Sequence, residues 1–452
     1  MKPIVRLAID LASGAVRSRT LVDECLDRIA DPAGEGERAF LTVAADRARA
    51  TADAVDAMRA AGTAPGPYAG IPVAVKDLCD IEGEVSTAGS TVLGDRPPAA
   101  ADAPVAARLR AAGMVVLGRT NMTEFAFSGL GLNSHYDTPR SPWGREVGHI
   151  PGGSSSGTAV AVADGMAAAG LGTDTGGSCR VPAAFCGIVG YKPTARRIPL
   201  DGIVPLSFSL DSAGPLARTV ECCAIVDDIF AGGPGTDVPA ARPPDRMRLA
   251  AIQDYVLSDL DDTVAGAYEA GLAALRAAGV EVVEVDFPEL DELPTINAKG
   301  GLATAEAYHW HRELLASRAN QYDQRVRIRI EPGVDVSAAD YIDVLLARQR
   351  LIGAASSRLR GFDAFVLPTV AIVPPTMASF DDGDPAYYSR TNLLCLRNTS
   401  VGNFLDSCSI SVPATPPGEP PVGIMLMGRP MDDPNLFSLA RTTEAVLANS
   451  WG

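Results

Sequence analysis

The segment GGSSSGTAVAVADGMAAAGLGTDTGGSCRVPA, residues 152–183, carries the strongest structural signal in this sequence. It contains two turns of small residues, Gly152–Gly157 and Gly172–Ser178, separated by an Ala/Val-rich stretch, 158–169, whose composition predicts a helix. Glycine adopts positive φ and lets other groups approach the backbone closely, so serines set among glycines can be held in tight, accessible turns. We therefore expect a buried helix to bring the serines of the two turns together, with the rest of the chain supporting them.

The surrounding sequence alternates between helical and strand-like patterns. Predicted helices cover residues 5–30 (a pair), 43–61, 105–113 and 261–278, and predicted strands cover 71–75, 114–117, 187–191, 248–252 and 280–285. Apolar residues recur at helical spacing in the first set and alternate or run continuously in the second, which are the periodicities of the two elements. Strands that alternate with helices predict an α/β fold built around one sheet.

Three stretches rich in Pro, with Gly or Asp, interrupt this alternation, at residues 231–245, 374–384 and 413–421. Such composition is typical of loops and linkers. The sequence contains no internal repeat and no low-complexity tract. We predict one large domain over residues 1–452, in which 231–245 is a surface linker and 246–452 completes the fold and carries excursions toward a pocket.

Charge and composition exclude several classes of protein. The chain has 452 residues and a net charge of −16, with 55 acidic and 39 basic residues, whereas binding to nucleic acid or to an anionic membrane depends on clustered Lys and Arg. Only Arg325, Arg327 and Arg329 form a short alternating basic run. No apolar run approaches the roughly 18 residues of a membrane span, and the opening residues lack the apolar core of a signal peptide.

The cysteines indicate a reducing compartment. All 8 are scattered along a long chain, and no CxxC pair that could bind zinc occurs. Disulfide frameworks belong to short secreted chains with closely spaced cysteines. We expect reduced thiols in a cytoplasmic protein.

Three short patterns suggest other interpretations when each is taken alone. Residues 153–157 satisfy G-x-S-x-G, the pattern of the nucleophile elbow of α/β-hydrolases. That elbow needs a preceding hydrophobic strand and a downstream acid and His, but the preceding residues 148–152 (GHIPG) are not a strand pattern. Asp174-Thr175-Gly176 matches the aspartic-protease triplet. Such enzymes need a second aspartate beside the first, but no second Asp-Thr/Ser-Gly triplet occurs in this sequence. A Gly/Ser run alone is more often a flexible linker, yet linkers are not followed directly by an apolar helix and a second glycine–serine turn.

A serine hydrolase without a catalytic histidine uses all of these parts. The chain has only 4 histidines, His135, His149, His309 and His311, and none lies in the two turns. A serine nucleophile needs a proton acceptor, and a lysine whose pKa is lowered by burial can serve. Lys76, at the end of an otherwise apolar strand, is the candidate, and a solvated strand end is the alternative interpretation.

Several longer motifs are similar to those of the amidase signature family. They are 152–157, 172–183 and 73–77, together with 118–125 (GRTNMTEF), 141–143 (SPW), 185–194 (FCGIVGYKPT) and 211–215 (DSAGP). They occur in the family's order and spacing, densely over a signature core of about residues 65–220. The resemblance implies the family's fold, a large central twisted mixed β-sheet surrounded by α-helices.

The resemblance also implies a Ser–cisSer–Lys triad. Ser178 in the second turn matches the family's nucleophile. Ser154 matches the bridging serine, whose preceding peptide bond is cis in the family, and Lys76 matches the general base. Ser155 and Thr173 match residues that hydrogen-bond the lysine and order the network.

The second turn matches the family's oxyanion hole. The matching backbone N–H groups belong to Thr175, Gly176, Gly177 and Ser178. Glycines suit this role because backbone donors must stand about 3 Å from the developing oxyanion and side chains would obstruct them.

A mechanism follows from the resemblance. Lys76 accepts the Ser178 proton through Ser154 while Ser178 attacks an amide carbonyl, the relay returns the proton to the leaving amine, and water releases the acyl group. These steps need no metal and no organic cofactor.

The resemblance gives fewer substrate contacts. The candidate substrate-binding residues are Phe125, Phe127, Ser128, Gly129 and Arg180. The first four match a loop that usually lines the family's pocket. For Arg180 the favoured interpretation is a buttress of the turn together with Asp174, and contact with a substrate carboxylate is the alternative. Segments 309–329 and 374–389 are predicted pocket walls.

Together these observations predict a stand-alone amidase that hydrolyses the C–N bond of a small soluble amide or ureide, with a homodimer as the family's default. A glutaminase (A-type) subunit of a tRNA-dependent amidotransferase is the first alternative. It is disfavoured by Val181, where that branch usually has glutamine, and by TDTGGS from Thr173, where it commonly has SDTGGS. A non-catalytic scaffold is disfavoured because all three triad positions hold competent residues.

Overall fold

One mixed sheet of 11 strands runs through the computed structural model, which describes residues 1–451. The strands are β1 Phe40–Val43, β2 Pro72–Lys76, β3 Val115–Thr120, β4 Ala169–Asp174, β5 Val189–Lys192, β6 Ser212–Ala217, β7 Arg248–Ile252, β8 Glu281–Val285, β9 Ala364–Pro368, β10 Ser409–Pro413 and β11 Gly423–Met427. Their order across the sheet is β1-β3-β2-β4-β6-β5-β10-β11-β9-β7-β8. The predicted α/β class and central mixed sheet are confirmed.

The sheet combines two parallel parts with an antiparallel middle. β2 runs parallel to both β3 and β4, and β7 runs parallel to both β8 and β9. The remaining pairs are antiparallel, including β10 with β5 and β11 with β9. Strands from the end of the chain therefore join the two parallel parts.

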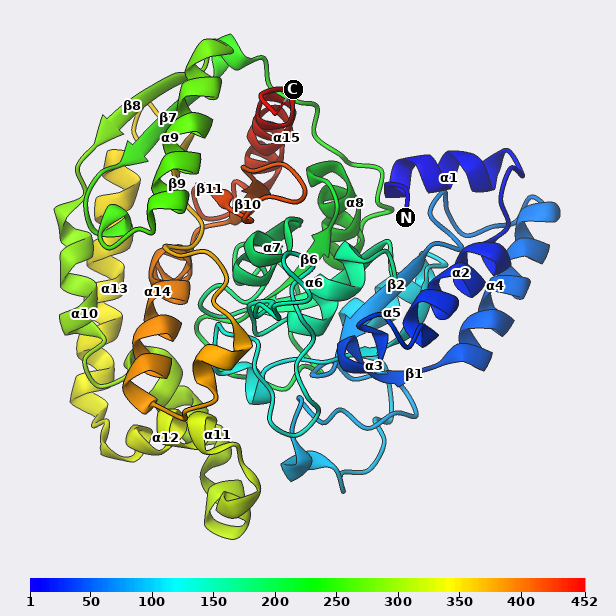
Figure 1. The fold of residues 1–452 in the computed structure, drawn as a ribbon, viewed down its shortest axis with the longest axis horizontal. Coiled ribbons are helices and arrows are strands. Elements are labelled where there is room, and N and C mark those ends of the chain that lie inside the picture. Colours follow the sequence, from blue (N-terminus) through cyan, green and yellow to red (C-terminus); the bar gives the residue numbers. More distant parts are fainter. Residues whose placement is uncertain (452) are drawn as a thin grey trace.

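Helices cover the sheet and fill both ends of the molecule (Figure 1). They are α1 Ile4–Ala12, α2 Ser18–Ala30, α3 Gly36–Ala39, α4 Ala45–Ala60, α5 Pro104–Ala111, α6 Ser156–Ala163, α7 Arg180–Cys186, α8 Val220–Ala231, α9 Asp262–Ala277, α10 Leu293–Ile296, α11 Gly301–Arg318, α12 Gln324–Ile330, α13 Ala338–Arg358, α14 Pro385–Phe404 and α15 Asp433–Asn449. In Figure 1, α1, α2 and α4 (blue) lie at one end, α10 and α13 at the other, and α6 and α7 between them. None of the helices described is long and apolar enough to cross a membrane.

The first glycine–serine turn leads into α6, which begins at Ser156, two residues before the predicted start, and ends at Ala163 rather than continuing to Ala169. The prediction of a helix over 158–169 is wrong beyond that point. Gly165 has a φ of +72° just past the helix end, a conformation that favours glycine. Residues from Ala169 onward instead pair with β2 and β6 as β4, so sheet pairing overrides their helical composition.

β2 is buried along its whole length, including Lys76. It lies between β3 and β4, and apolar side chains of the core pack against it. The alternative interpretation of Lys76 as a solvated strand end is therefore wrong. The predicted linker 231–245 contains the last residue of α8, a stretch without helix or strand, and a short 3₁₀ turn at Pro244–Arg246.

Candidate active site

Lys76 points into the interior from the end of β2. Its Nζ donates hydrogen bonds to Ser154 Oγ at 2.8 Å and to Thr173 Oγ1 at 2.9 Å. The side chain is fully buried and forms no ion pair among the described residues 1–451. Burial disfavours the charged ammonium and lowers the pKa of Lys76 to about 7. A neutral lysine that can accept a proton is therefore accessible near neutral pH.

Ser154 follows a cis peptide bond from Gly153, as the resemblance predicts. The Gly153 N–H donates to Gly129 O at 2.8 Å, and Ser154 O accepts from Thr123 N–H at 3.1 Å. A Cβ on Gly153 would lie 2.6 Å from the Gly131 backbone nitrogen, so only glycine fits there. These contacts fix the first turn against the loop that carries Phe125–Gly129.

Ser155 is placed differently from the prediction. Thr173 bonds the lysine as expected, but Ser155 Oγ instead donates to the Thr173 carbonyl oxygen at 3.4 Å. The physical reason is that Ser155 immediately precedes α6, where its side chain faces β4 rather than the end of β2. Ser155 also joins the two turns, because its N–H donates to Ser178 O at 3.3 Å.

The second turn connects β4 to α7 and presents free backbone donors. The N–H groups of Gly176, Gly177 and Ser178 donate to no atom of the described part of the chain. Gly177 has a φ of +141°, and a Cβ there would lie 2.2 Å from Thr399 Oγ1. This position therefore requires glycine on grounds of both conformation and space.

Ser178 lies beside the first turn and is 3% exposed. Within residues 1–451 its Oγ forms no hydrogen bond. The structure therefore joins Lys76 to Ser154 and Thr173 by direct hydrogen bonds, but it does not join Ser178 Oγ to them. Catalytic hydrogen bonds are often long in unliganded enzymes and tighten when substrate binds.

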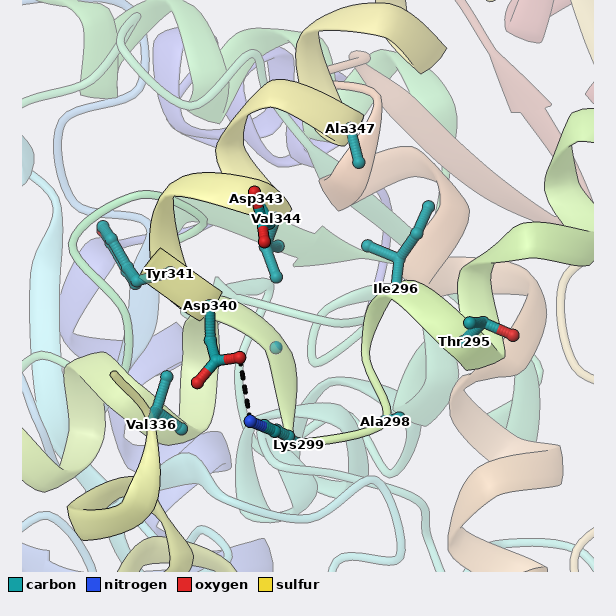
Figure 2. A pocket seen from close by; sticks show the side chains of 11 residues that line it. Thr295, Ile296, Ala298, Lys299, Val336, Asp340, Tyr341, Asp343, Val344 and Ala347 are labelled. Carbon is teal, nitrogen blue, oxygen red and sulfur yellow. Dashed lines mark hydrogen bonds and ion pairs between the residues drawn. The ribbon is translucent and has the colours of Figure 1, made fainter. Parts of the chain in front are cut away.

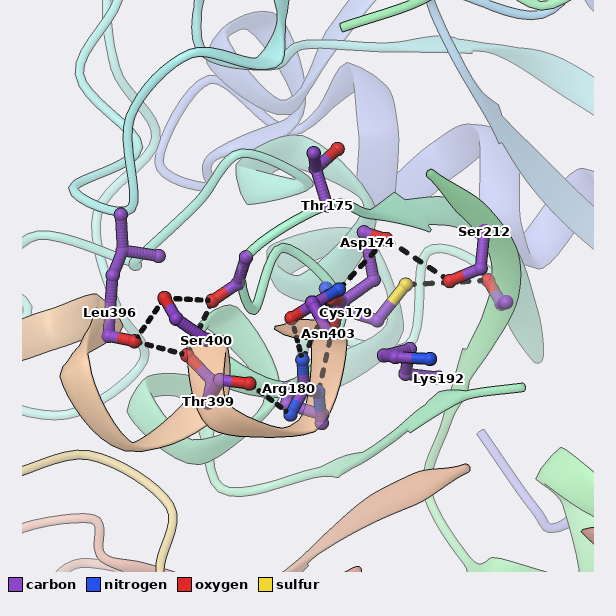
Figure 3. Close-up of polar contacts among 12 residues, drawn as sticks. Asp174, Thr175, Cys179, Arg180, Lys192, Ser212, Leu396, Thr399, Ser400 and Asn403 are labelled. Atoms are coloured by element: carbon purple, nitrogen blue, oxygen red, sulfur yellow. Dashed lines mark hydrogen bonds and ion pairs between the residues drawn. The ribbon is translucent and has the colours of Figure 1, made fainter. Parts of the chain in front are cut away.

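Arg180 and Asp174 form a buried ion pair behind this turn (Figure 3). Arg180 Nη2 lies 2.8 Å from Asp174 Oδ1, and Nε lies 3.0 Å from Oδ2. Burial alone would raise the pKa of Asp174, but the Arg180 guanidinium lowers it to about 2. Arg180 also donates to Thr399 O and to Asn403 Oδ1. Because its donors are used inside the fold, Arg180 has the geometry of a buttress rather than that of a substrate contact.

Helix α14 supplies residues that sequence reasoning missed. Thr399 Oγ1 donates to Gly176 O at 2.6 Å, and Asn403 Nδ2 donates to Asp174 Oδ1 at 2.9 Å (Figure 3). No local pattern marks these residues, because they lie more than 200 positions from the turn that they hold.

The predicted substrate loop packs against α12 and its neighbours. The Phe125 ring lies 4.4 Å from that of His311 and 5.3 Å from that of Tyr322. Phe127 lies under the Arg329 guanidinium at 4.9 Å. Segment 309–329 therefore contacts the loop, and its role as a pocket wall stays a prediction.

A hollow of about 340 Å³ lies elsewhere, between α10, α11 and α13 (Figure 2). Its polar lining includes the Lys299–Asp340 ion pair, with a 2.8 Å separation. None of the predicted site residues lines it.

Comparison with known proteins gives a consistent result. A family model described as Amidase matches residues 20–437. A 2-amino-5-chloromuconic acid deaminase from Comamonas testosteroni is 37% identical over 416 residues, covering 90% of this chain and 88% of the relative. The A-type subunit of a Glutamyl-tRNA(Gln) amidotransferase from Roseiflexus castenholzii is 35% identical, with 99% of this chain and 97% of the relative covered. A solved structure described as an amidase superposes with a TM-score of 0.89 at 29% identity, with both chains covered completely.

Proposed function

This chain belongs to the amidase signature family of hydrolases that act on amide C–N bonds, and from that premise we propose its mechanism and substrate class. The proposed enzyme hydrolyses a small amide that carries a carboxylate, through an acyl-enzyme on Ser178. Lys76 is the general base and Ser154 relays the proton. The conclusion depends above all on Lys76, a buried lysine without an ion-pair partner whose Nζ donates to Ser154 Oγ at 2.8 Å.

The proposed reaction has two halves. Ser178 Oγ attacks the amide carbonyl carbon while its proton passes to Ser154 Oγ and the Ser154 proton passes to Lys76 Nζ. The free N–H groups of the second turn bind the oxyanion that forms. The relay then returns a proton to the nitrogen, the C–N bond breaks, and the amine or ammonia leaves. Water, deprotonated through the same relay, releases the carboxylate product.

The substrate class rests on the three alternating arginines of α12. Arg325 pairs with Asp323 at 2.6 Å and Arg327 pairs with Glu331 at 3.3 Å, but Arg329 pairs with no acid of the described residues. Its Nε is buried without a partner, and burial lowers its pKa. Because a partly buried guanidinium without an acid partner is costly, an anionic ligand would offset that cost.

The polar groups around Arg329 connect it to the first turn. Arg329 lies over the Phe127 ring at 4.9 Å, and the next residue, Ser128, accepts from the Tyr388 hydroxyl at 2.9 Å and donates to Asn392 Oδ1 at 2.9 Å. Asn392 Nδ2 is buried and donates to no described atom. Gly129, next along this loop, accepts from Gly153 N–H. Two unused donors thus adjoin the loop that holds Ser154, and the relative named for 2-amino-5-chloromuconic acid acts on an organic acid.

Covalent labelling tests the nucleophile. An alkyl fluorophosphonate is expected to modify Ser178, as mapped by peptide mass spectrometry, and Ser178→Ala is expected to remain unmodified. Label on Ser155 would instead support the G-x-S-x-G elbow, and absence of label would contradict the proposed mechanism.

A matched pair of arginine variants tests the substrate class. For amides that carry a carboxylate, Arg329→Ala is expected to raise KM about ten-fold or more, since a charge-assisted hydrogen bond contributes about 1.5–3 kcal/mol. Arg327→Ala, which removes an arginine already paired with Glu331, is the control and is expected to change KM little. Equal effects of Arg329→Ala on neutral and carboxylate-bearing amides would contradict the assignment.

A glutaminase of the amidotransferase type is the second candidate, because the amidotransferase relative covers nearly the whole chain. It predicts glutaminase activity that appears only when partner subunits are added. Turnover of amides by the purified chain alone, without glutaminase activity, would exclude it.

A further inference from the structure

Glu306, on α11, is a buried carboxylate without a basic partner among the described residues. It is 6% exposed and accepts four hydrogen bonds. Three come from one loop, from Ser207 Oγ, from Ser209 N–H at 3.0 Å and from Ser209 Oγ at 2.5 Å. The fourth comes from the Tyr341 hydroxyl on α13 at 2.6 Å.

The tip of the loop that Glu306 holds has little hydrophobic packing of its own, whereas Leu206 at the start of the loop is buried in the core. Phe208 lies between the two serines and is 60% exposed. An exposed aromatic side chain contributes little burial energy to its own segment. The hydrogen bonds to Glu306 therefore restrain the tip of this loop, in addition to the bonds that the loop makes within itself.

The same loop leads to the second turn through Asp211. Asp211 Oδ2 accepts from Leu206 N–H at 2.9 Å and from Ser207 N–H at 3.0 Å. Its Oδ1 accepts from Thr175 Oγ1 at 2.5 Å. Thr175 follows Asp174 in the second turn (Figure 3) and directly precedes Gly176, Gly177 and Ser178, whose N–H groups donate to no atom of the described residues.

We propose that Glu306 is a positioning residue for the oxyanion-binding turn, acting through loop 206–211 and Asp211 on Thr175. The proposal rests on the proposed role of Ser178 and its turn. A carboxylate suits this position because all four of its bonds are accepted ones, whereas a glutamine amide accepts at one oxygen only, so two of the four groups lose their acceptor and their hydroxyls must rotate to keep a bond. Oxyanion donors stabilise the transition state only when placed within hydrogen-bond distance of the developing charge, so a displaced Thr175 slows the chemical step and leaves substrate binding intact.

Glu306→Gln tests this inference with the alkyl fluorophosphonate as the probe. In labelling, Ser178 Oγ forms a bond to phosphorus, the P–F bond breaks, fluoride leaves, and the serine proton passes to the lysine relay. Because loss of one oxyanion donor costs about 10²–10³-fold in rate, displacement of the turn is expected to slow labelling by about ten-fold or more. Glu313→Gln, an exposed glutamate on the same helix, is the matched control and is expected to label at the wild-type rate.

A double-mutant cycle separates positioning from general loss of structure. Thr175→Val removes the hydroxyl that bonds Asp211 while keeping the side-chain shape. If Glu306 acts through Thr175, the Glu306→Gln/Thr175→Val double variant labels no more slowly than the slower single variant. On amides turned over by the wild type, kcat falls and KM stays within about two-fold. Multiplicative effects in the cycle, or a change confined to KM, would overturn the proposal.

The outcomes also distinguish this inference from the proposed function. A wild-type protein that is not labelled on Ser178 contradicts the proposed function itself. A labelled wild type with an equally fast Glu306→Gln contradicts only the positioning role. If Glu306→Gln does not fold, Ser209→Ala, which removes a single bond to Glu306, takes its place, and an unchanged labelling rate in that variant overturns the proposal.

Discussion

Lys76 and Arg180 are two fully buried cations on either side of the same turn, and the fold treats them in opposite ways. Arg180 has an acid at 2.8 Å and further acceptors on α14, at Thr399 and Asn403. Among residues 1–451 Lys76 forms hydrogen bonds with two hydroxyl oxygens alone, and burial lowers its pKa to about 7. A fully partnered cation keeps its charge and fixes the backbone, whereas an unpaired one is ready to exchange a proton.

The difference shows that the partners of a buried basic side chain indicate its role. An ion-paired side chain stabilises the fold, whereas an unpaired one is a candidate for proton transfer. Desolvation acts on both residues, and the carboxylate of Asp174 is what separates them. Variants of the buried cations test this distinction in order of expected effect.

Removal of Lys76 is expected to have the largest effect on activity. Lys76→Met keeps the length of the side chain and deletes the proton acceptor, so kcat is expected to fall about 10²–10⁴-fold, the usual contribution of a general base. Loss of an uncompensated buried amine leaves the folded state intact, which thermal unfolding would verify. Activity within two-fold of the wild type would show that the lysine is not the base.

Removal of Arg180 is expected to act on stability instead. Arg180→Met leaves Asp174 buried without its cation, which costs about 3–5 kcal/mol of unfolding free energy, measurable by urea denaturation. Adding Asp174→Leu to this variant removes the orphaned charge and is expected to recover part of the loss. A cost below about 1 kcal/mol for Arg180→Met alone would contradict the buttress role.

The pH profile is expected to report the proton acceptor. The pKa of Lys76 is lowered from 10.5 to about 7, so the amine is protonated and inactive at lower pH. We expect kcat/KM to rise as pH increases through about 7 and then to level off. The unfolded chain binds one more proton than the folded chain between about 7 and 10.5, so this group also makes unfolding less favourable as pH rises across that window. A profile that is flat from pH 5 to 9 would contradict a lysine base.

A third buried cation gives the smallest expected effect. Lys192 Nζ donates only to Pro193 O, at 2.7 Å, and burial lowers the pKa of Lys192 to about 8. Figure 3 places it near Arg180 without a direct bond to the turn. Because replacing a buried charge by an apolar group of similar size is often neutral or stabilising, Lys192→Met is expected to keep activity within about two-fold. A large loss of kcat would assign Lys192 to the site.

The sequence predicted the parts of the site that lie in continuous motifs. Lys76 was marked by its place at the end of an apolar strand and the two glycine–serine turns by their composition, whereas the roles of Ser154 and Ser178 were implied by the family resemblance. The alternation of elements predicted the α/β class. Helix composition misled over residues 164–169, because the chain turns at Gly165 and then enters β4 at Ala169, where it pairs with β2 and β6.

The remaining site residues could not be predicted because their roles arise only from tertiary contacts. Glu306 and Thr399 lie in helices of ordinary composition, and their partners are far away in the chain. Arg329 resembles Arg325 and Arg327 in sequence, and only the folded structure shows that it is the one without an acid.

The order of strands in the sheet has a consequence for synthesis on the ribosome. β10 and β11, residues 409–427, lie between β5 and β9, so the sheet consists of two unjoined parts until nearly the whole chain has emerged. The nascent protein thus carries an unpaired strand edge at β5, a template for aggregation, while later segments are being made. Nascent chains truncated before residue 409 are expected to depend on chaperones, and the second turn is expected to reach its final form only when α14 has docked on it.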